Sequence, residues 1–210
     1  TPLTSKRTSV ATSMKNKLES IFVEPILKKE STPDGFLSIQ SFEKLLELNF
    51  FNQKYYVATD MANGGYLAIT RMNTFDYLNT NKNTRINLED IDHLLYEDIP
   101  GEIIKKEMLT TPYPGISILN KTKKEDYQKY HIYKTPLEIV IIKLGGKGDY
   151  ALKHSDKVFN SISFKPISKE QIEFSPNFGK YSVKIPQNYS FESFDIAGKN
   201  VIQSYDDSGY

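Results

Sequence analysis

The sequence contains no cysteine and no tryptophan among its 210 residues. Without cysteine there is no disulfide scaffold, no thiolate zinc site and no cysteine nucleophile. Long hydrophobic runs are missing too: no apolar stretch approaches the roughly 18 residues that a membrane-spanning helix needs, and no apolar signal-peptide segment is found near the start. Arginine is scarce and the net charge is only +1. We therefore predict no membrane span and no nucleic-acid partner.

What is present fits a globular protein. Hydrophobic residues make up 39% of the chain and charged residues 25%, with 14 Tyr and 12 Phe. That balance is typical of neither a disordered nor a membrane chain. The length suits one large domain or two small ones.

The N-terminal part, residues 1–35, is predicted to be a helical lead-in followed by a linker. Met14, Leu18, Ile21 and Phe22 recur at helical spacing, which predicts a short amphipathic helix over about residues 10–23. Neighbouring lysines allow a basic helix that binds a membrane surface or a partner. Interspersed glutamates favour instead a helix packed on its own domain. Residues 31–35 have turn chemistry and form the expected linker.

The next segment predicts a short helix and then a hairpin. Ser41 precedes apolar residues at 42, 45, 46 and 48, which indicates a second short helix capped by a hydroxyl. Strands are expected over 55–59 and 66–71, because Asn63-Gly64 between two such runs is a strong hairpin signal. The polar stretch 73–87 is predicted to be an exposed loop.

Asn87 is expected to cap a helix that ends at Pro100-Gly101. Strand-like runs follow over 102–110, 115–122 and 126–144, the last one breaking near Thr135-Pro136. Residues 137–144 are the most apolar stretch, so we expect them to form a central strand covered on both faces. After a turn at 145–149, Ser155 is expected to cap a last helix.

A second segment, rich in Pro and Tyr, begins near Phe174 and contains strand-like runs at 181–186, 191–194 and 201–204. It resembles a restart of the segment from Tyr55, and it stops before a helix would follow. We therefore predict a complete α+β domain over 36–168 and the start of a second, truncated copy over 169–210. The abrupt end and the missing initiator Met predict a chain cut from a longer protein.

The order of elements over about residues 54–166 resembles a PsbP-like domain. The residues that carry the resemblance are Tyr133–Leu144, similar to the buried strands before the last helix of that family, and Tyr150–Phe164, similar to the helix and strand that close the domain. The resemblance implies an α/β/α sandwich, an antiparallel sheet flanked by helices. Members are mostly binding or assembly modules without shared catalytic residues, and some are bacterial periplasmic lipoproteins.

No constellation in the sequence predicts catalysis, a metal or a cofactor. His93, His131 and His154 lack metal-binding spacing, and we expect His93 and His154 to have surface or capping roles. The loop Gly145–Gly148 lacks the P-loop pattern and is predicted to be a tight turn. No catalytic residue, metal ligand or cofactor is therefore assigned.

The most suggestive stretch is 121–134, where tyrosines and lysines alternate. As a strand it places Tyr127, Lys129, His131 and Tyr133 on one face and Tyr130 on the other. Such a surface suits a protein partner or an anionic glycan. Alternatively, its lysines protect a sheet edge. The binding candidates are Lys123, Lys124, Tyr127, Lys129, Tyr130, His131 and Tyr133.

These observations favour a non-catalytic binding or assembly module of a larger bacterial envelope complex. We expect it in the periplasm or at the outer membrane, its signal peptide removed. One alternative is the accessory region of a hydrolase whose catalytic domain lies beyond residue 210. Another is an enzyme built from Asp, Glu, Tyr and Lys, for which Tyr127 and His131 would be the first residues to test.

Overall fold

A computed structural model describes residues 24–50, 53–80, 86–88, 91, 101–176 and 180–206. In this part of the chain fourteen strands accompany two helices. The α/β/α sandwich that the PsbP-like resemblance implied is therefore wrong, because most of the described chain is strand in several antiparallel sheets. The helix predicted over 10–23 and most of the helix predicted from Asn87 lie outside the described residues.

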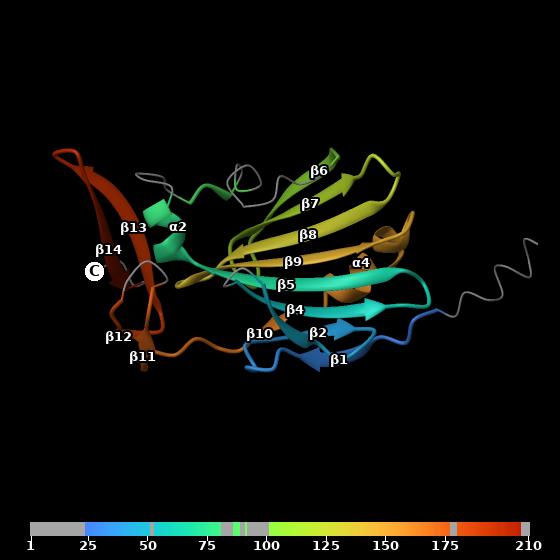
Figure 1. The fold of residues 1–210 in the computed structure, drawn as a ribbon, viewed down its shortest axis with the longest axis horizontal. Coiled ribbons are helices and arrows are strands. Elements are labelled where there is room, and N and C mark those ends of the chain that lie inside the picture. The colour runs from blue at the N-terminus through green and yellow to red at the C-terminus, as the bar shows by residue number, and fades with distance from the viewer. Residues whose placement is uncertain are drawn as a thin grey trace, which may run out of the picture.

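A seven-stranded antiparallel sheet forms the centre of the fold, in the order β3-β4-β5-β9-β8-β7-β6 (Figure 1). Its strands are β3 (Leu46–Phe50), β4 (Gln53–Asp60), β5 (Gly65–Asn73), β6 (Glu102–Leu109), β7 (Gly115–Lys121), β8 (Tyr127–Lys134) and β9 (Glu138–Gly146). Each strand pairs with its neighbour in the chain except at β5 and β9, which are distant in sequence. The sheet is thus two meanders joined at one place.

One face of the sheet is covered by α4 (Tyr150–Phe159) and by a small sheet of order β1-β2-β10. The small sheet consists of β1 (Lys28–Ser31), β2 (Leu37–Ser41) and β10 (Ser163–Phe164). Ile39 of β2 and Val158 of α4 meet Ile142 of β9 in a common core, and all three are fully buried. We call this side the covered face.

The opposite face carries a second core at one end. Here α2 (Thr74–Thr80) packs beside β13 (Tyr189–Ile196) and β14 (Lys199–Asp206). A further hairpin, β11 (Gln171–Phe174) with β12 (Val183–Pro186), contributes Phe174. In Figure 1 these C-terminal hairpins stand next to α2 at one end of the large sheet. We call this side the open face.

Several predicted strands are confirmed. The Asn63-Gly64 turn joins β4 to β5, and the long run 126–144 breaks after Lys134 into β8 and β9. β9 is the central strand of seven, and Ile139 and Ile142 on its two faces are both fully buried. Strands also form in the predicted C-terminal runs. A continuous apolar run identified β9, which is packed on both faces, and the Asn-Gly signal identified the β4–β5 hairpin.

Three local predictions are wrong. Residues 46–50 form an exposed strand, since Leu46, Leu48 and Phe50 alternate with polar residues and do not form a helical stripe. Residues 74–80, predicted as loop, are helical, because the Asn73 side chain accepts a hydrogen bond from the Phe75 N–H at 2.8 Å and caps α2. The last helix begins at Tyr150, five residues before Ser155.

The predicted division into three domains stays a prediction. The turn at 31–35, expected to be a linker, joins β1 to β2 within one hairpin. At the other boundary, Phe174 and Phe191 share a core cluster with Ile132 of the large sheet.

Candidate functional site

The tyrosine- and lysine-rich strand exists as predicted, but it lies inside the sheet. β8 pairs with β7 on one side and β9 on the other. The interpretation that its lysines protect a sheet edge is therefore wrong. The alternation of side chains is as predicted, with Tyr127, Lys129, His131 and Tyr133 on the covered face and Tyr130 on the open face.

The seven candidate residues do not form one site. Lys123 and Lys124 are exposed in the turn between β7 and β8, while Tyr130 and Tyr133 are buried. Only Lys129 and His131 line the same pocket, a hollow of about 260 Å³ between α4 and strands β6 to β8. Whether any of these residues binds a partner stays a prediction.

His131 is held by aromatic rings. Its imidazole stacks on Phe159 of α4 with 4.1 Å between ring centroids, and its Nδ1 is 2.9 Å from the Tyr133 hydroxyl. Burial lowers the pKa of His131 to about 3, and the nearby Lys129 ammonium acts in the same direction. The ring is therefore neutral at physiological pH and packs on Phe159.

The rest of that pocket carries charges of both signs. Glu107 and Asp156 line it together with Lys129. Burial lowers the pKa of Lys129, with Glu107 opposing the shift. Because acidic and basic groups are mixed, the pocket supports an anionic glycan poorly.

His154 was expected to have a surface or capping role, and that expectation is wrong, because the residue is buried within α4 and the N-cap is Asp149. It lies in α4 with 8% of its surface exposed, and its ring centroid is 4.6 Å from that of Tyr150. The Tyr150 hydroxyl in turn donates to Asp60 Oδ2 at 2.9 Å. This is a packing arrangement that holds α4 against the β4–β5 hairpin. His93 lies outside the described residues.

The turn predicted over 145–149 is shorter in the structure, because Gly145 and Gly146 end β9 and pair with Tyr66 and Gly65 of β5. A Cβ on Gly145 would lie 2.5 Å from the Tyr66 ring, and a Cβ on Gly146 would lie 2.7 Å from the Tyr150 ring. The Gly148 N–H donates to Asp126 Oδ1 at 2.7 Å. The loop amide is therefore engaged within the protein, which agrees with a turn.

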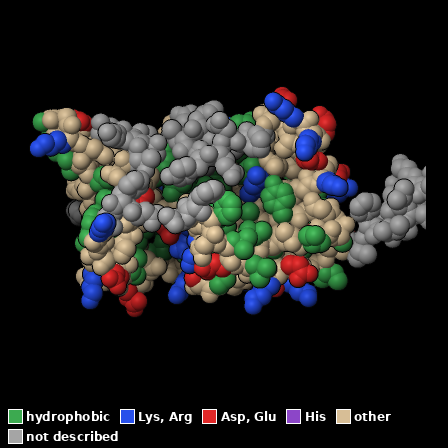
Figure 2. All heavy atoms as spheres, viewed as in Figure 1, with side chains coloured by type: hydrophobic (Ala, Val, Ile, Leu, Met, Phe, Trp, Pro, Cys, Tyr) green, Lys and Arg blue, Asp and Glu red, His purple; other side chains and the backbone are tan. Residues whose placement is uncertain are grey.

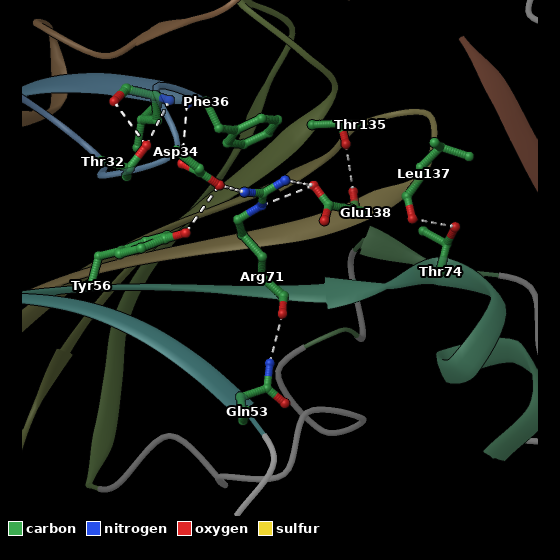
Figure 3. Close-up of polar contacts among 11 residues, drawn as sticks. Thr32, Asp34, Phe36, Gln53, Tyr56, Arg71, Thr74, Thr135, Leu137 and Glu138 are labelled. Carbon is green, nitrogen blue, oxygen red and sulfur yellow. Dashed lines mark hydrogen bonds and ion pairs between the residues drawn. The ribbon is translucent and has the colours of Figure 1, made fainter. Parts of the chain in front are cut away.

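Sequence reasoning missed a polar network around Arg71 of β5 (Figure 3). The guanidinium donates to Glu138 Oε2 from Nε at 2.9 Å and from Nη2 at 2.7 Å, and Nη1 forms an ion pair with Asp34. Asp34 also accepts from the Tyr56 hydroxyl at 3.0 Å. The Phe36 ring lies under the guanidinium at 3.8 Å. The network ties β5 and β9 to the β1–β2 turn.

The two carboxylates of this network respond in opposite directions. Burial raises the pKa of Glu138, and Arg71 only partly offsets this. The pKa of Asp34 is lowered, because contacts with Thr32, the Phe36 N–H and Arg71 outweigh its desolvation. Glu138 is the more enclosed side chain, 24% exposed against 35% for Asp34. The sequence signal was Arg71, the one charged residue of β5, and Glu138 at the start of the mostly apolar β9.

The two edges of the large sheet differ in chemistry. On β3, Leu46, Leu48 and Phe50 point to the open face and are 61%, 53% and 65% exposed. They pair with Val57, Tyr55 and Gln53 of β4. We call Leu46, Leu48 and Phe50, with Tyr55 and Val57, the β3 patch. Figure 2 shows hydrophobic side chains gathered on the open face over the region where Figure 1 places β4 and β5.

The other edge is β6. Its Lys105 forms an exposed ion pair with Glu107 at 2.8 Å, and Lys106 follows on the other face. The pairing with β7 shifts register between Ile103 and Lys105, which is a β-bulge. Lysines and bulges are the usual means of preventing edge-to-edge pairing. β3, in contrast, pairs with β4 without interruption.

Within the described residues no group of three or more His, Asp or Glu side chains could hold a metal ion. None of the helices in that same part is both long and apolar enough to cross a membrane.

Comparisons with known proteins give little. No family model matches the chain, and no curated protein matches it. A crystal structure from Bacteroides thetaiotaomicron is similar at a TM-score of 0.32 and 11% identity, covering 72% of this chain. The chain spans 54% of the length of that structure. Membership of the PsbP-like family therefore stays a prediction.

Proposed function

We propose that this chain is a non-catalytic binding and assembly module that takes a protein partner at the β3 patch. The observation that supports this is the exposure of Leu46, Leu48 and Phe50, each more than half accessible, on a sheet edge that no bulge protects. Exposed apolar patches of this kind mark interaction sites in folded proteins. Among the described strands none pairs with the outer side of β3, so this edge adds backbone donors and acceptors that a partner can use.

The site chemistry supports binding more than turnover. The one histidine in the pocket beside α4 is kept neutral by burial and stacks on Phe159. The Arg71 guanidinium is engaged by two carboxylates. We place the module in a bacterial envelope complex, as the sequence predicts, and this location rests on the PsbP-like resemblance alone.

The test compares three forms of the chain as bait. Tagged wild-type protein, a Leu46→Asp/Leu48→Asp variant and an Ile104→Asp/Met108→Asp variant are incubated with an envelope extract that also contains the untagged chain. The last variant is the control, because Ile104 and Met108 are exposed on the opposite edge strand. Bound proteins are identified and quantified by mass spectrometry.

We expect the wild type and the β6 control to retain the same protein, and the β3 variant to lose it at least tenfold. Circular dichroism must show that all three forms are folded. If no protein, including the untagged chain, depends on the β3 patch, the proposal is wrong.

A further inference from the structure

We propose that the partner at the β3 edge is a second copy of this chain, bound by antiparallel β3–β3 pairing about a twofold axis. This inference rests on the proposed function and names its partner. The pairing would join two seven-stranded sheets into one. The β3 strand has the sequence Leu46-Glu-Leu-Asn-Phe50, apolar at each odd step and polar at each even one, so it reads alike in both directions.

The register follows from this symmetry. With Leu48 opposite Leu48 of the second copy, all five residues of β3 are paired: Leu46 faces Phe50, and Glu47 faces Asn49. A shift of one residue would set apolar side chains opposite polar ones and turn one apolar row to the wrong face. A twofold axis perpendicular to the sheet keeps both open faces on one side, so the two apolar rows become continuous.

Charge is compatible with this register. Glu47 is the only charged residue of β3, and its carboxylate already pairs with Lys54 of β4 at 3.1 Å. Opposite it stands Asn49 of the second copy, so no like charges face one another across the axis. Centring the pairing on Glu47 would bring two carboxylates together and would leave part of the strand unpaired. The observed sequence therefore selects the Leu48 register.

The same pairing is excluded at the other edge. β6 has two adjacent lysines and a bulge between Ile103 and Lys105. An antiparallel copy of β6 would have to match a shifted register and accommodate the Lys106 side chain on the apolar face. Of the two edges of the described seven-stranded sheet, β3 is the one suited to this pairing, so two such sheets join as a closed dimer and not as a polymer. A five-residue strand pair lies near the lower limit of specific interfaces, about 1,000 Å², so we expect a dissociation constant in the micromolar range.

The first experiment is sedimentation equilibrium of the full chain from about 1 to 300 µM, a range that brackets micromolar affinity. Wild type is expected to pass from monomer to dimer, and Leu48→Lys to stay monomeric. Met108→Lys is the matched control, because Met108 is also 53% exposed on an edge strand, and it should dimerise as wild type does. A wild type that is monomeric throughout overturns the self-pairing.

The second experiment uses the absence of native cysteine. In the proposed register the two Leu48 Cα atoms would be about 4.5 to 5.5 Å apart, which is within reach of a disulfide. Under a mild oxidant Leu48→Cys should therefore form a covalent dimer at least tenfold faster than Met108→Cys. Equal rates would overturn the register even if Leu48→Lys did not fold. A monomeric wild type that still binds another protein through the β3 patch would remove the self-pairing and leave the proposed function intact.

Discussion

The two edges of the large sheet are strands of similar exposure that differ in charge and regularity, although β6 also exposes the apolar residues Ile104 and Met108. β3 presents Leu46, Leu48 and Phe50 in regular pairing with β4, while β6 presents Lys105 and Lys106 beside a bulge. An edge that needs no partner is expected to carry charge and irregularity, as β6 does. The proposed pairing at β3 depends on this difference, and the predictions below test it.

The largest effect is expected from Arg71, which stabilises the sheet on the side of the β3 edge. Arg71→Ala removes both ion pairs and leaves the Glu138 carboxylate, 24% exposed, without its guanidinium. We expect a loss of about 2–3 kcal/mol in the free energy of unfolding. Lys105→Ala at the β6 edge, whose ion pair is exposed, should cost no more than about 0.5 kcal/mol. Urea titration monitored by circular dichroism measures both; equal losses would contradict the comparison.

The second-largest effect is expected from acid, which should lower the stability of the β6 side of the sheet through His131. The pKa of His131 is about 3 in the folded protein, below the ordinary value of 6.5. The unfolded chain therefore takes up a proton between pH 6.5 and 3 that the folded chain does not, so stability falls as pH falls through this window. Above pH 6.5 the residue contributes no pH dependence.

His131→Gln removes the imidazole that takes up this proton and keeps a polar side chain beside Tyr133. Between pH 7 and pH 4.5 we expect the wild type to lose about 2.5 kcal/mol more than the variant. Urea unfolding at both pH values measures the difference, and the carboxylates common to both proteins cancel. Parallel losses in the two proteins would show that His131 is not the acid-sensitive group.

The smallest change in stability is expected from making β6 resemble β3. Lys105→Leu/Lys106→Leu removes the two lysines and retains the bulge. The free energy of unfolding should change by less than about 0.5 kcal/mol, as is usual for exposed substitutions. The readout is assembly: with two apolar edges the chain should form species larger than a dimer in sedimentation velocity. If it does not, the bulge alone protects the edge.

The comparison also explains what sequence could and could not predict. β9 was identifiable because Ile139, Val140 and Ile142 face packed layers and leave an uninterrupted apolar run. The sequence predicts a helix where β3 lies, because Phe42, Leu45 and Leu46 have helical spacing. A strand of five exposed residues has no row of buried side chains that would indicate a strand instead. The β3 patch therefore could not be predicted without knowing that β3 pairs with β4.

The candidate site shows the same limit. The alternation along β8 was predicted, but burial of Tyr130 and Tyr133 depends on α4 and on neighbouring strands that no local pattern specifies. The Arg71 network joins residues 34, 71 and 138, which are far apart in the chain. Only the topology brings them together. Arg71 and Glu138 lie in mostly apolar strands, which indicates that each needs an oppositely charged partner but does not identify that partner.

The junction between β5 and β9 has a consequence for how the chain folds. Strands β3 to β5 and strands β6 to β9 each pair with their neighbours in the chain, and the two groups pair with each other along the whole of β5 and β9, from Gly65 opposite Gly146 to Asn73 opposite Glu138. Closing that pair brings together residues separated by the whole segment 74–137, whereas the other pairings within the large sheet join neighbours in the chain. The β2–β10 pair of the small sheet is the other distant pairing, so the entropic cost of loop closure falls on these two steps. Folding rate should therefore respond most to substitutions along this single line of contact, and hydrogen exchange should report the two halves as separate cooperative units.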